Sequence, residues 1–227
     1  MRHISDKLFC ILFAFLVFGL CASSAFAAGI KPSDRAETFE ITINPAYNYS
    51  KDLSGSNGAD ASINDTWGWG FGFGYNFNEK LNLAWNIGWS SPSYKATFVP
   101  DTGTPQQVSG TLSSTSSMFI GTYNFMAKTL TPFVTAGLGW VFVDSNIPSG
   151  QVGTGCWWTW YGYYCGNYET TYGTSEFAYG LGLGARWDLG QSVFLKAAYN
   201  VTWIDNLGNA GTQDFDTLYL TIGFMMQ

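Results

Sequence analysis

Residues 65–77 read DTWGWGFGFGYNF, and this stretch decides the fold class. Every odd position from Trp67 to Phe77 is aromatic, whereas the even positions between them are glycine, apart from Asn76. Side chains of a β-strand point alternately to opposite faces, so this period of two predicts a strand with one aromatic face and one nearly bare face. A sheet surface in water normally carries charged and hydroxyl side chains, and a face of glycines therefore suits a narrow, enclosed space.

The same alternation recurs at 39–49 and at 81–90, where apolar odd positions alternate with small or polar even positions. The apolar face and the face of small or polar residues are both explained if the first meets lipid and the second lines the interior of a barrel. A secreted β-sandwich, whose aromatic face packs against a second sheet, is the alternative. Beyond the N-terminal leader the longest apolar run, 140–143, is far too short for a membrane-spanning helix.

Eight strands are predicted, and the connections between them alternate in length. The strands cover 38–50, 65–77, 81–92, 114–126, 131–143, 176–188, 192–204 and 214–226. Long connections at 51–64, 93–113 and 144–175 alternate with short ones at 78–80, 127–130 and 189–191, and 205–213 is intermediate. Short periplasmic turns and long outer loops are typical of bacterial outer-membrane barrels. We therefore predict an all-β fold, an eight-stranded antiparallel up-and-down transmembrane β-barrel.

Aromatic side chains are expected at both headgroup zones of such a barrel. Near the short connections they are Tyr75, Phe77, Tyr123, Phe125, Trp187 and Phe224, and near the long connections they are Tyr47, Tyr49, Trp67, Trp69, Trp89, Trp140, Phe142, Phe177 and Trp203. Aromatic residues that merely filled a core would not form two such bands. The bands therefore favour the lipid-facing barrel.

The first 27 residues are expected to be a targeting signal and not part of the folded domain. Arg2 and Lys7 precede an apolar stretch at 8–20, and 25–27 read Ala-Phe-Ala, a small-x-small cleavage site. The sequence thus predicts a cleaved signal peptide at 1–27, a short periplasmic segment at 28–37 and the barrel at 38–227. The predicted location is the outer membrane of a Gram-negative cell.

Composition excludes several classes of function. Charged residues make up 11% of the chain, and 10 Lys and Arg stand against 16 Asp and Glu, so no positive surplus is available to neutralise nucleic-acid phosphates. The one histidine, His3, lies in the predicted leader, which removes histidine-based catalysis and histidine-ligated metals from the mature chain. We therefore expect no catalytic residue, metal, cofactor or nucleic-acid partner.

Charged side chains are predicted inside the barrel. The alternation places Glu40, Glu176, Arg186 and Lys196 on the inward face. Charges in a confined lumen must be paired or hydrated, so an ion-pair network that plugs the interior is the first interpretation. A gated polar path for small solutes is the alternative, because the many inward glycines would leave room for water.

The third outer connection has the most individual sequence. Residues 156–165 read CWWTWYGYYC, and two cysteines in an exported chain are expected to form a disulfide, here between Cys156 and Cys165. Trp and Tyr are favoured at binding hot spots, so the candidate surface-recognition residues are Trp157, Trp158, Trp160, Tyr161, Tyr163 and Tyr164. The loop recognises a protein or glycan, dips into the outer-leaflet headgroups or forms a lid over the barrel mouth. The sequence leaves these three interpretations open.

With these patterns in place, the chain resembles the eight-stranded outer-membrane barrels of the OmpA and OmpX type over 38–227. The likeness lies in LTPFVTAGLG at 130–139, in GLGLGARW at 180–187 followed by LKAAY at 195–199, and in the closing strand with Leu218, Leu220, Ile222 and Phe224. The resemblance implies that these four closing-strand residues form the signal read by the barrel-assembly machinery. The chain departs from the family pattern in having Met225, Met226 and Gln227 after the aromatic residue that usually comes last.

The predicted function is that of an integral outer-membrane protein with a structural or surface-interaction, adhesin-like role. A narrow porin-like channel for small solutes or apolar molecules is the alternative. The expected partners are outer-membrane lipids and lipopolysaccharide, the barrel-assembly machinery and, for the recognition interpretation, a host protein or glycan.

Overall fold

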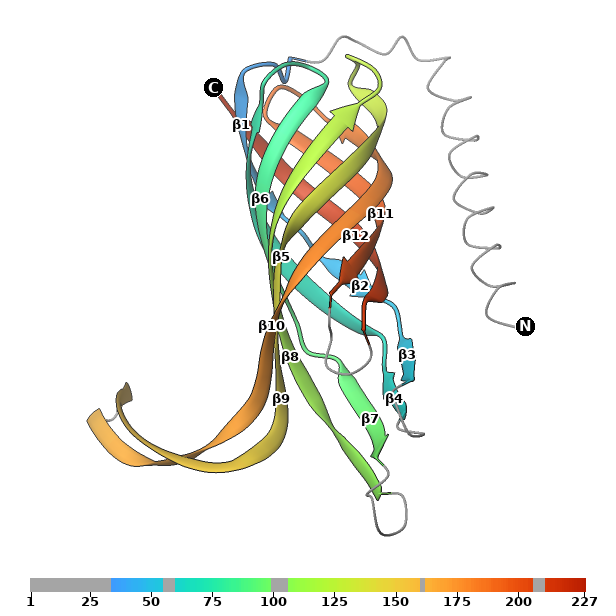
Figure 1. The fold of residues 1–227 in the computed structure, drawn as a ribbon. Helices are drawn as coiled ribbons and strands as arrows, with labels where there is room; N and C mark the ends of the chain where they lie inside the picture. Colours follow the sequence, from blue (N-terminus) through green and yellow to red (C-terminus); the bar gives the residue numbers. More distant parts are fainter. Residues whose placement is uncertain (1–33, 55–59, 99–105, 160–161, 206–210) are drawn as a thin grey trace.

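The chain closes into a ring of antiparallel strands (Figure 1). The computed structural model describes residues 34–54, 60–98, 106–159, 162–205 and 211–227, so the predicted signal peptide at 1–27 lies outside the described residues. The ring consists of β1 (Thr38–Ile43) with β2 (Ala46–Asn48), β5 (Thr66–Asn76), β6 (Leu81–Ser90), β8 (Gln106–Asn124), β9 (Leu130–Thr159), β10 (Gly162–Asp188), β11 (Val193–Ile204) and β12 (Gln213–Met226). Successive β1 and β2 both pair with β5 and with β12, which closes the ring and confirms the predicted eight-stranded barrel.

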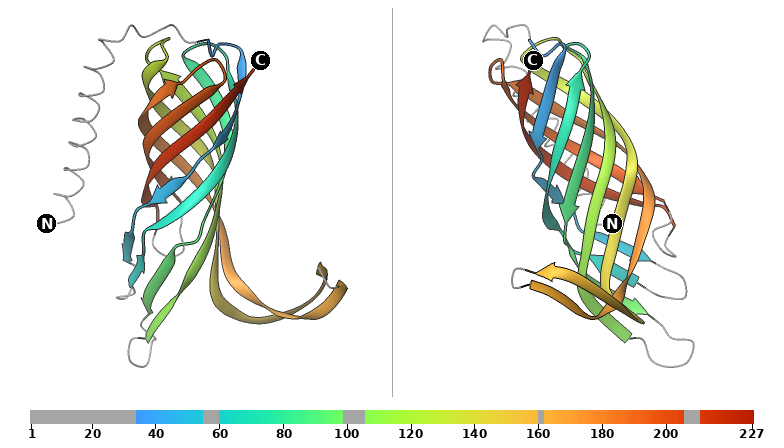
Figure 2. Two further views of the ribbon diagram at one scale, coloured as in Figure 1. Left: turned by 180° about the vertical axis from the view of Figure 1, so that it is seen from behind. Right: turned by 90° about the vertical axis from the view of Figure 1, so that its left-hand side faces the viewer.

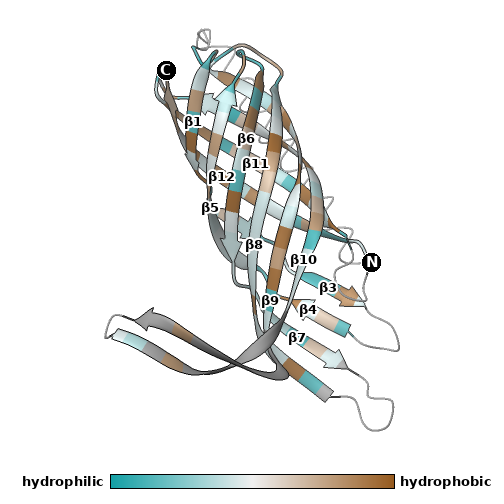
Figure 3. Cartoon of the chain, turned by 60° about the vertical axis from the view of Figure 1, so that its left-hand side comes forward, coloured by the Kyte–Doolittle hydropathy of each residue, from teal (hydrophilic) through white to brown (hydrophobic). Residues whose placement is uncertain are grey.

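The aromatic faces of the strands point away from the lumen. Trp67 and Trp69 are 64% and 54% exposed, whereas Gly70 and Gly72 are buried. Figure 3 shows hydrophobic and hydrophilic residues alternating along the strands. A closed ring with an exposed apolar band is the arrangement of a barrel in lipid, and no second sheet covers that band in the described part of the chain. The β-sandwich alternative is therefore excluded.

Within the described residues, no helix is long and apolar enough to cross a membrane.

The first predicted strand, 38–50, is divided into β1 and β2 at Asn44 and Pro45. Proline has no amide hydrogen to donate to a neighbouring strand, which explains the break. The remaining backbone groups are still bonded: the Asn44 amide donates to the Gly70 carbonyl at 2.9 Å, and the Leu220 amide donates to the Pro45 carbonyl at 3.0 Å. The ring thus stays closed across the break.

The expectation of long outer loops was wrong for much of 51–64, 93–113 and 144–175, because these connections contain strands. β3 (Lys51–Ser54), β4 (Asp60–Ile63) and β7 (Ser93–Phe98) pair in the order β3, β4, β7 and then the outer part of β8. Backbone hydrogen bonding that continues from the barrel strands needs no apolar face, so the alternation of the membrane-spanning part is not required here.

The outer parts of β9 and β10 form a two-stranded ribbon beyond the barrel, called the outer ribbon below (residues 146–159 and 162–172). Its pairing register shifts between Glu169 and Thr171 and again between Thr171 and Gly173, with Pro148 opposite Thr171. Such irregularities bend a strand pair. Figures 1 and 2 show the outer ribbon leaving the barrel sideways, with its tip curving back toward the end that carries the short turns. The ribbon therefore does not cover the barrel mouth as a lid.

Candidate functional site

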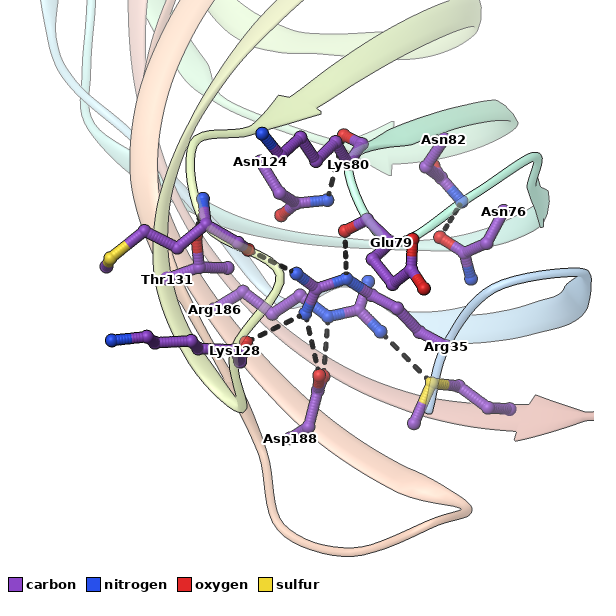
Figure 4. A network of polar contacts seen from close by, with 12 residues as sticks. Arg35, Asn76, Glu79, Lys80, Asn82, Asn124, Lys128, Thr131, Arg186 and Asp188 are labelled. Carbon is purple, nitrogen blue, oxygen red and sulfur yellow. Dashed lines mark hydrogen bonds and ion pairs between the residues drawn. The ribbon is translucent and has the colours of Figure 1, made fainter. Parts of the chain in front are cut away.

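A chain of alternating charges fills the lumen near the short turns, and Figure 4 shows its Arg35, Asp188 and Arg186 side chains. Glu40 on β1 accepts hydrogen bonds from Arg186 Nη1 at 2.5 Å and from Lys196 Nζ at 3.1 Å. Arg186 Nε also donates to Asp188 Oδ1 at 2.6 Å, and Arg35 Nη1 donates to Asp188 Oδ2 at 2.7 Å. The Arg35, Arg186, Glu40 and Asp188 side chains are almost completely buried, so the pairing satisfies charges that would otherwise be costly in the lumen.

The strand register explains why Glu40 is needed. Arg186 lies directly opposite Lys196 in the pairing of β10 with β11, and like charges in such positions repel. The Glu40 carboxylate bonds to both cations, and Asn76 Nδ2 donates a further hydrogen bond to Glu40 Oε1 at 2.7 Å. The Phe194 ring lies beneath both cations, 4.0 Å from the Arg186 guanidinium carbon and 4.7 Å from the Lys196 ammonium nitrogen. These contacts offset the repulsion.

Arg35 joins the turns at this end of the barrel. Its Nε donates to the Glu79 carbonyl at 2.5 Å in the turn between β5 and β6. In the turn between β8 and β9, Nη2 donates to the Met126 carbonyl at 2.7 Å and Nη1 to the Lys128 carbonyl at 3.2 Å. Through Asp188 the same side chain reaches the end of β10. One arginine before the first strand thus ties two separate turns and the end of β10 to the charge network.

The surroundings of Arg35 act on its charge in opposite directions. Burial lowers the pKa of Arg35, and the neighbouring Arg186 guanidinium lowers it further. The Asp188 carboxylate and, more weakly, Glu40 raise the pKa. The pKa of Arg35 is lowered overall, so the carboxylates offset only part of the effect of burying this arginine.

A second layer closes the lumen near the opposite end. Val141, Ala178 and Ile204 are buried together, and Met118, Val143 and Phe215 pack against them. Met118 lies on the inward face of β8, where an apolar side chain would otherwise meet a polar interior. The apolar cluster accounts for it.

Side chains from neighbouring strands fill the space that inward glycines leave. A Cβ at Gly182 would lie 1.8 Å from Asn200 Oδ1, and a Cβ at Gly223 would lie 2.1 Å from Phe194 Cζ. The room expected for water at these glycines is therefore occupied by protein. A cavity of 30 Å³ remains between the charge network and the apolar cluster, and it is large enough to hold water. Its lining residues are Met118, Ile120, Thr135, Gly137, Gly180, Asn200, Thr202 and Tyr219.

Three of the four lumen charges selected from the sequence, Glu40, Arg186 and Lys196, are in contact. Glu176 is not in this network: it is half-buried near the outer end of the barrel and accepts a hydrogen bond from the Thr174 hydroxyl. Sequence reasoning missed Asp188 and Arg35. Asp188 follows Arg186 by two positions, so the alternation alone already placed it inward.

The candidate recognition residues lie on the outer ribbon. Cys156 and Cys165 are opposite each other in the strand register and are joined by a disulfide, with a Cα separation of 4.0 Å. Trp157 and Trp158 lie on β9, while Tyr163 and Tyr164 lie on β10, and the Tyr163 side chain is 60% exposed. Trp160 and Tyr161 lie outside the described residues.

The closing-strand residues Leu218, Leu220, Ile222 and Phe224 all face outward from β12 and are exposed. Phe224 lies opposite Ile41 of β1 and Val193 of β11, so it sits where the last strand meets both of its neighbours. Among the described residues, no group of three His, Cys, Asp or Glu side chains is placed to hold a metal ion.

Comparison with known proteins identifies the family. The family model described as outer membrane protein beta-barrel domain matches residues 13–226. The chain belongs to this family. It is therefore an outer-membrane β-barrel protein, and the end with short turns is the one expected to face the periplasm. No curated protein matches the chain in sequence.

Solved structures share the architecture at low sequence identity. Neisserial surface protein A is 16% identical, with a TM-score of 0.50, over 83% of this chain and 96% of that chain. The outer membrane protein OprG from Pseudomonas aeruginosa is 11% identical, with a TM-score of 0.51, over 86% of this chain and 98% of that chain. At such identities the likeness establishes the fold.

Proposed function

We propose that this chain is a closed outer-membrane barrel that conducts no small solutes and acts through its outer strands at the cell surface. This is a structural or adhesin-like role. The observation that carries the proposal is the lumen, which is filled by the charge network near one end and by the apolar cluster near the other. An eight-stranded ring has an interior that side chains can just fill.

Planar-bilayer recording tests the closed lumen. We expect the purified, folded protein to give no reproducible conductance steps under conditions in which a general porin conducts. Reproducible single-channel steps that disappear in Arg186→Ala would overturn the proposal, because they would place the ion path through the charge network. They would support the alternative function, a narrow channel for small solutes.

The alternative channel has one structural feature in its favour, the 30 Å³ cavity between the two layers. A solute path through it would require both layers to part. Apolar molecules would meet the buried charges of Arg186 and Glu40, which favour water or ion pairing over hydrocarbon. Uptake of a labelled polar or apolar solute into vesicles with the protein reconstituted in their membrane would reveal a path for that class of molecule.

The proposed role is not enzymatic. The mature chain is expected to lack histidine, and its two cysteines are joined in the disulfide, so neither supplies a catalytic base or a nucleophile. The proposal includes removal of the leader after Ala27. The mass and N-terminal sequence of the protein recovered from outer membranes test that cleavage directly.

A further inference from the structure

The outer ribbon starts within the lipid-facing surface of the barrel. Trp140 and Phe177 face each other across β9 and β10, are exposed, and place their ring centroids 6.0 Å apart. Phe142, two residues further along β9, is 47% exposed. Pro148, where the register shifts, follows only six positions later. The ribbon therefore bends just beyond the aromatic girdle that marks the outer membrane surface.

The bend turns the outer ribbon across the long direction of the barrel. In Figures 1 and 2 the ribbon runs sideways, whereas the β7 and β8 strands continue outward along the barrel. A membrane plane lies across the axis of the barrel that it surrounds. The outer ribbon consequently runs along that plane, and the curvature brings its tip back toward the membrane side.

An open groove lies where the outer ribbon leaves the barrel. It has a volume of 390 Å³, and its lining residues are Ser113, Thr115, Phe142, Val143, Asp144, Gly173, Thr174 and Ser175. Thr115 and Ser175 lie opposite Phe142 on the two neighbouring strands. All three side chains therefore lie on the outward, lipid-side face of the sheet. One aromatic ring beside several hydroxyl groups and the Asp144 carboxylate matches the mixed chemistry of the zone between acyl chains and headgroups.

The composition of the outer ribbon also fits a bilayer interface. Between residues 145 and 175 only Glu169 is charged, whereas the other outer strands contain Lys51, Asp52, Asp60 and Lys95. Trp157 lies opposite Tyr164 and Trp158 lies opposite Tyr163, and both pairs lie within the loop that the disulfide closes. Trp and Tyr concentrate at membrane interfaces, where one part of the ring meets lipid and another meets water.

We propose that the outer ribbon docks on the outer leaflet of the bilayer that the barrel spans, with the strand ends that the disulfide joins, 156–159 and 162–165, in the headgroup layer. The ribbon extends the lipid contact of the barrel beyond the ring of strands. The inference deepens the proposed surface role, since it names the surface that the ribbon contacts, but it does not depend on whether the lumen conducts.

Paramagnetic relaxation in lipid nanodiscs tests this docking. The nanodiscs contain phosphatidylcholine, phosphatidylglycerol and a small fraction of lipid with a gadolinium chelate on its headgroup. We expect the backbone amide signals of 153–159 and 162–168 to lose most of their intensity. Amides of the β7 and β8 tip, at 95–98 and 106–109, serve as the internal comparison and should lose much less.

A variant links the effect to the aromatic tip. Trp157→Ser/Trp158→Ser/Tyr163→Ser should restore the ribbon signals while the barrel signals stay unchanged, and Leu53→Ser on β3 is the matched control. Ribbon amides that are attenuated no more than the β7 and β8 tip overturn the proposal and leave the ribbon free for a soluble partner or a second copy. Attenuation that persists in the triple variant also overturns it. Conductance recorded on the same samples reports separately on the closed lumen.

Discussion

Glu40 shows how one side chain can hold a lumen together. It accepts hydrogen bonds from two cations that the strand register places opposite each other, and it is 2% exposed. Neutralising it in Glu40→Gln leaves Arg186 and Lys196 facing each other in a buried site. We expect the free energy of unfolding to fall by about 3–5 kcal/mol, the range for breaking a buried pair. Urea titration of the protein in lipid vesicles, followed by tryptophan fluorescence, measures the loss.

An exposed ion pair provides the control for Glu40→Gln. Lys51 Nζ lies 2.6 Å from Asp214 Oδ1, but both side chains retain contact with solvent. Water screens such a pair, so Asp214→Asn should cost less than about 1 kcal/mol. Equal losses for the two variants would contradict the interpretation of the charge network as a structural plug.

Arg35 has a different role at the same scale, because its partners are backbone carbonyls in separate turns. In Arg35→Ala these carbonyls and Asp188 lose a buried donor. We expect amide hydrogen exchange to accelerate at 78–80 and 126–129, while exchange in the strands near the outer end stays as in the wild type. Hydrogen–deuterium exchange read by mass spectrometry resolves the two regions, and uniform acceleration would indicate general unfolding instead.

At the scale of a strand, β12 must pass close to Phe194. Gly223 leaves the space that the Phe194 ring occupies, and that ring in turn supports Arg186 and Lys196. Gly223→Ala therefore forces either the ring or the strand to move, and overpacking of this kind costs about 1–3 kcal/mol. Gly121→Ala is the matched control, since a Cβ there meets nothing closer than 3.8 Å. Urea midpoints of the two variants should differ accordingly.

The same strand carries the proposed assembly signal. Phe224 lies at the seam where β12 meets β1, and removing its ring in Phe224→Ala should slow insertion by the barrel-assembly machinery. Phe119→Ala is a fair comparison, because Phe119 is also an outward, half-exposed aromatic residue, on β8 away from the seam. Vesicles that contain the purified machinery give the folded fraction over time. Equal rates for the two variants would reject a special role for Phe224.

The elements that could be predicted from the sequence are those on which lipid imposes a pattern. Trp67 to Phe77 alternates because one face meets hydrocarbon and the other meets packed side chains. β3, β4, β7 and the outer ribbon were missed, because beyond the membrane neither face has to be apolar. The break at Pro45 could have been read from the missing amide hydrogen, but the alternation continues across it and concealed it.

At the scale of the whole molecule, some lumen residues could be predicted from the sequence and others could not. Glu40, Arg186 and Lys196 could be placed from their phase within the strands, since inward charges in a closed ring have few partners to choose from. Arg35 precedes the first alternating residue, and its place depends on two turns and the end of β10, which come together only when the ring closes. Glu176 shares the inward phase but lies too far along β10 to reach Glu40, which phase alone does not reveal.

Closure of the ring also determines how the molecule responds to reduction. The disulfide joins residues nine positions apart at the tip of the outer ribbon, outside the ring of strands. By contrast, the first and last strands of the ring are held together only by the hydrogen bonds that pair β12 with β1 and β2, without any covalent link. The unheated protein should therefore keep the altered gel mobility of a folded barrel after reduction or in Cys156→Ser/Cys165→Ser, and should lose it on boiling. Loss of the folded band on reduction alone would mean that the outer ribbon contributes to closure of the ring.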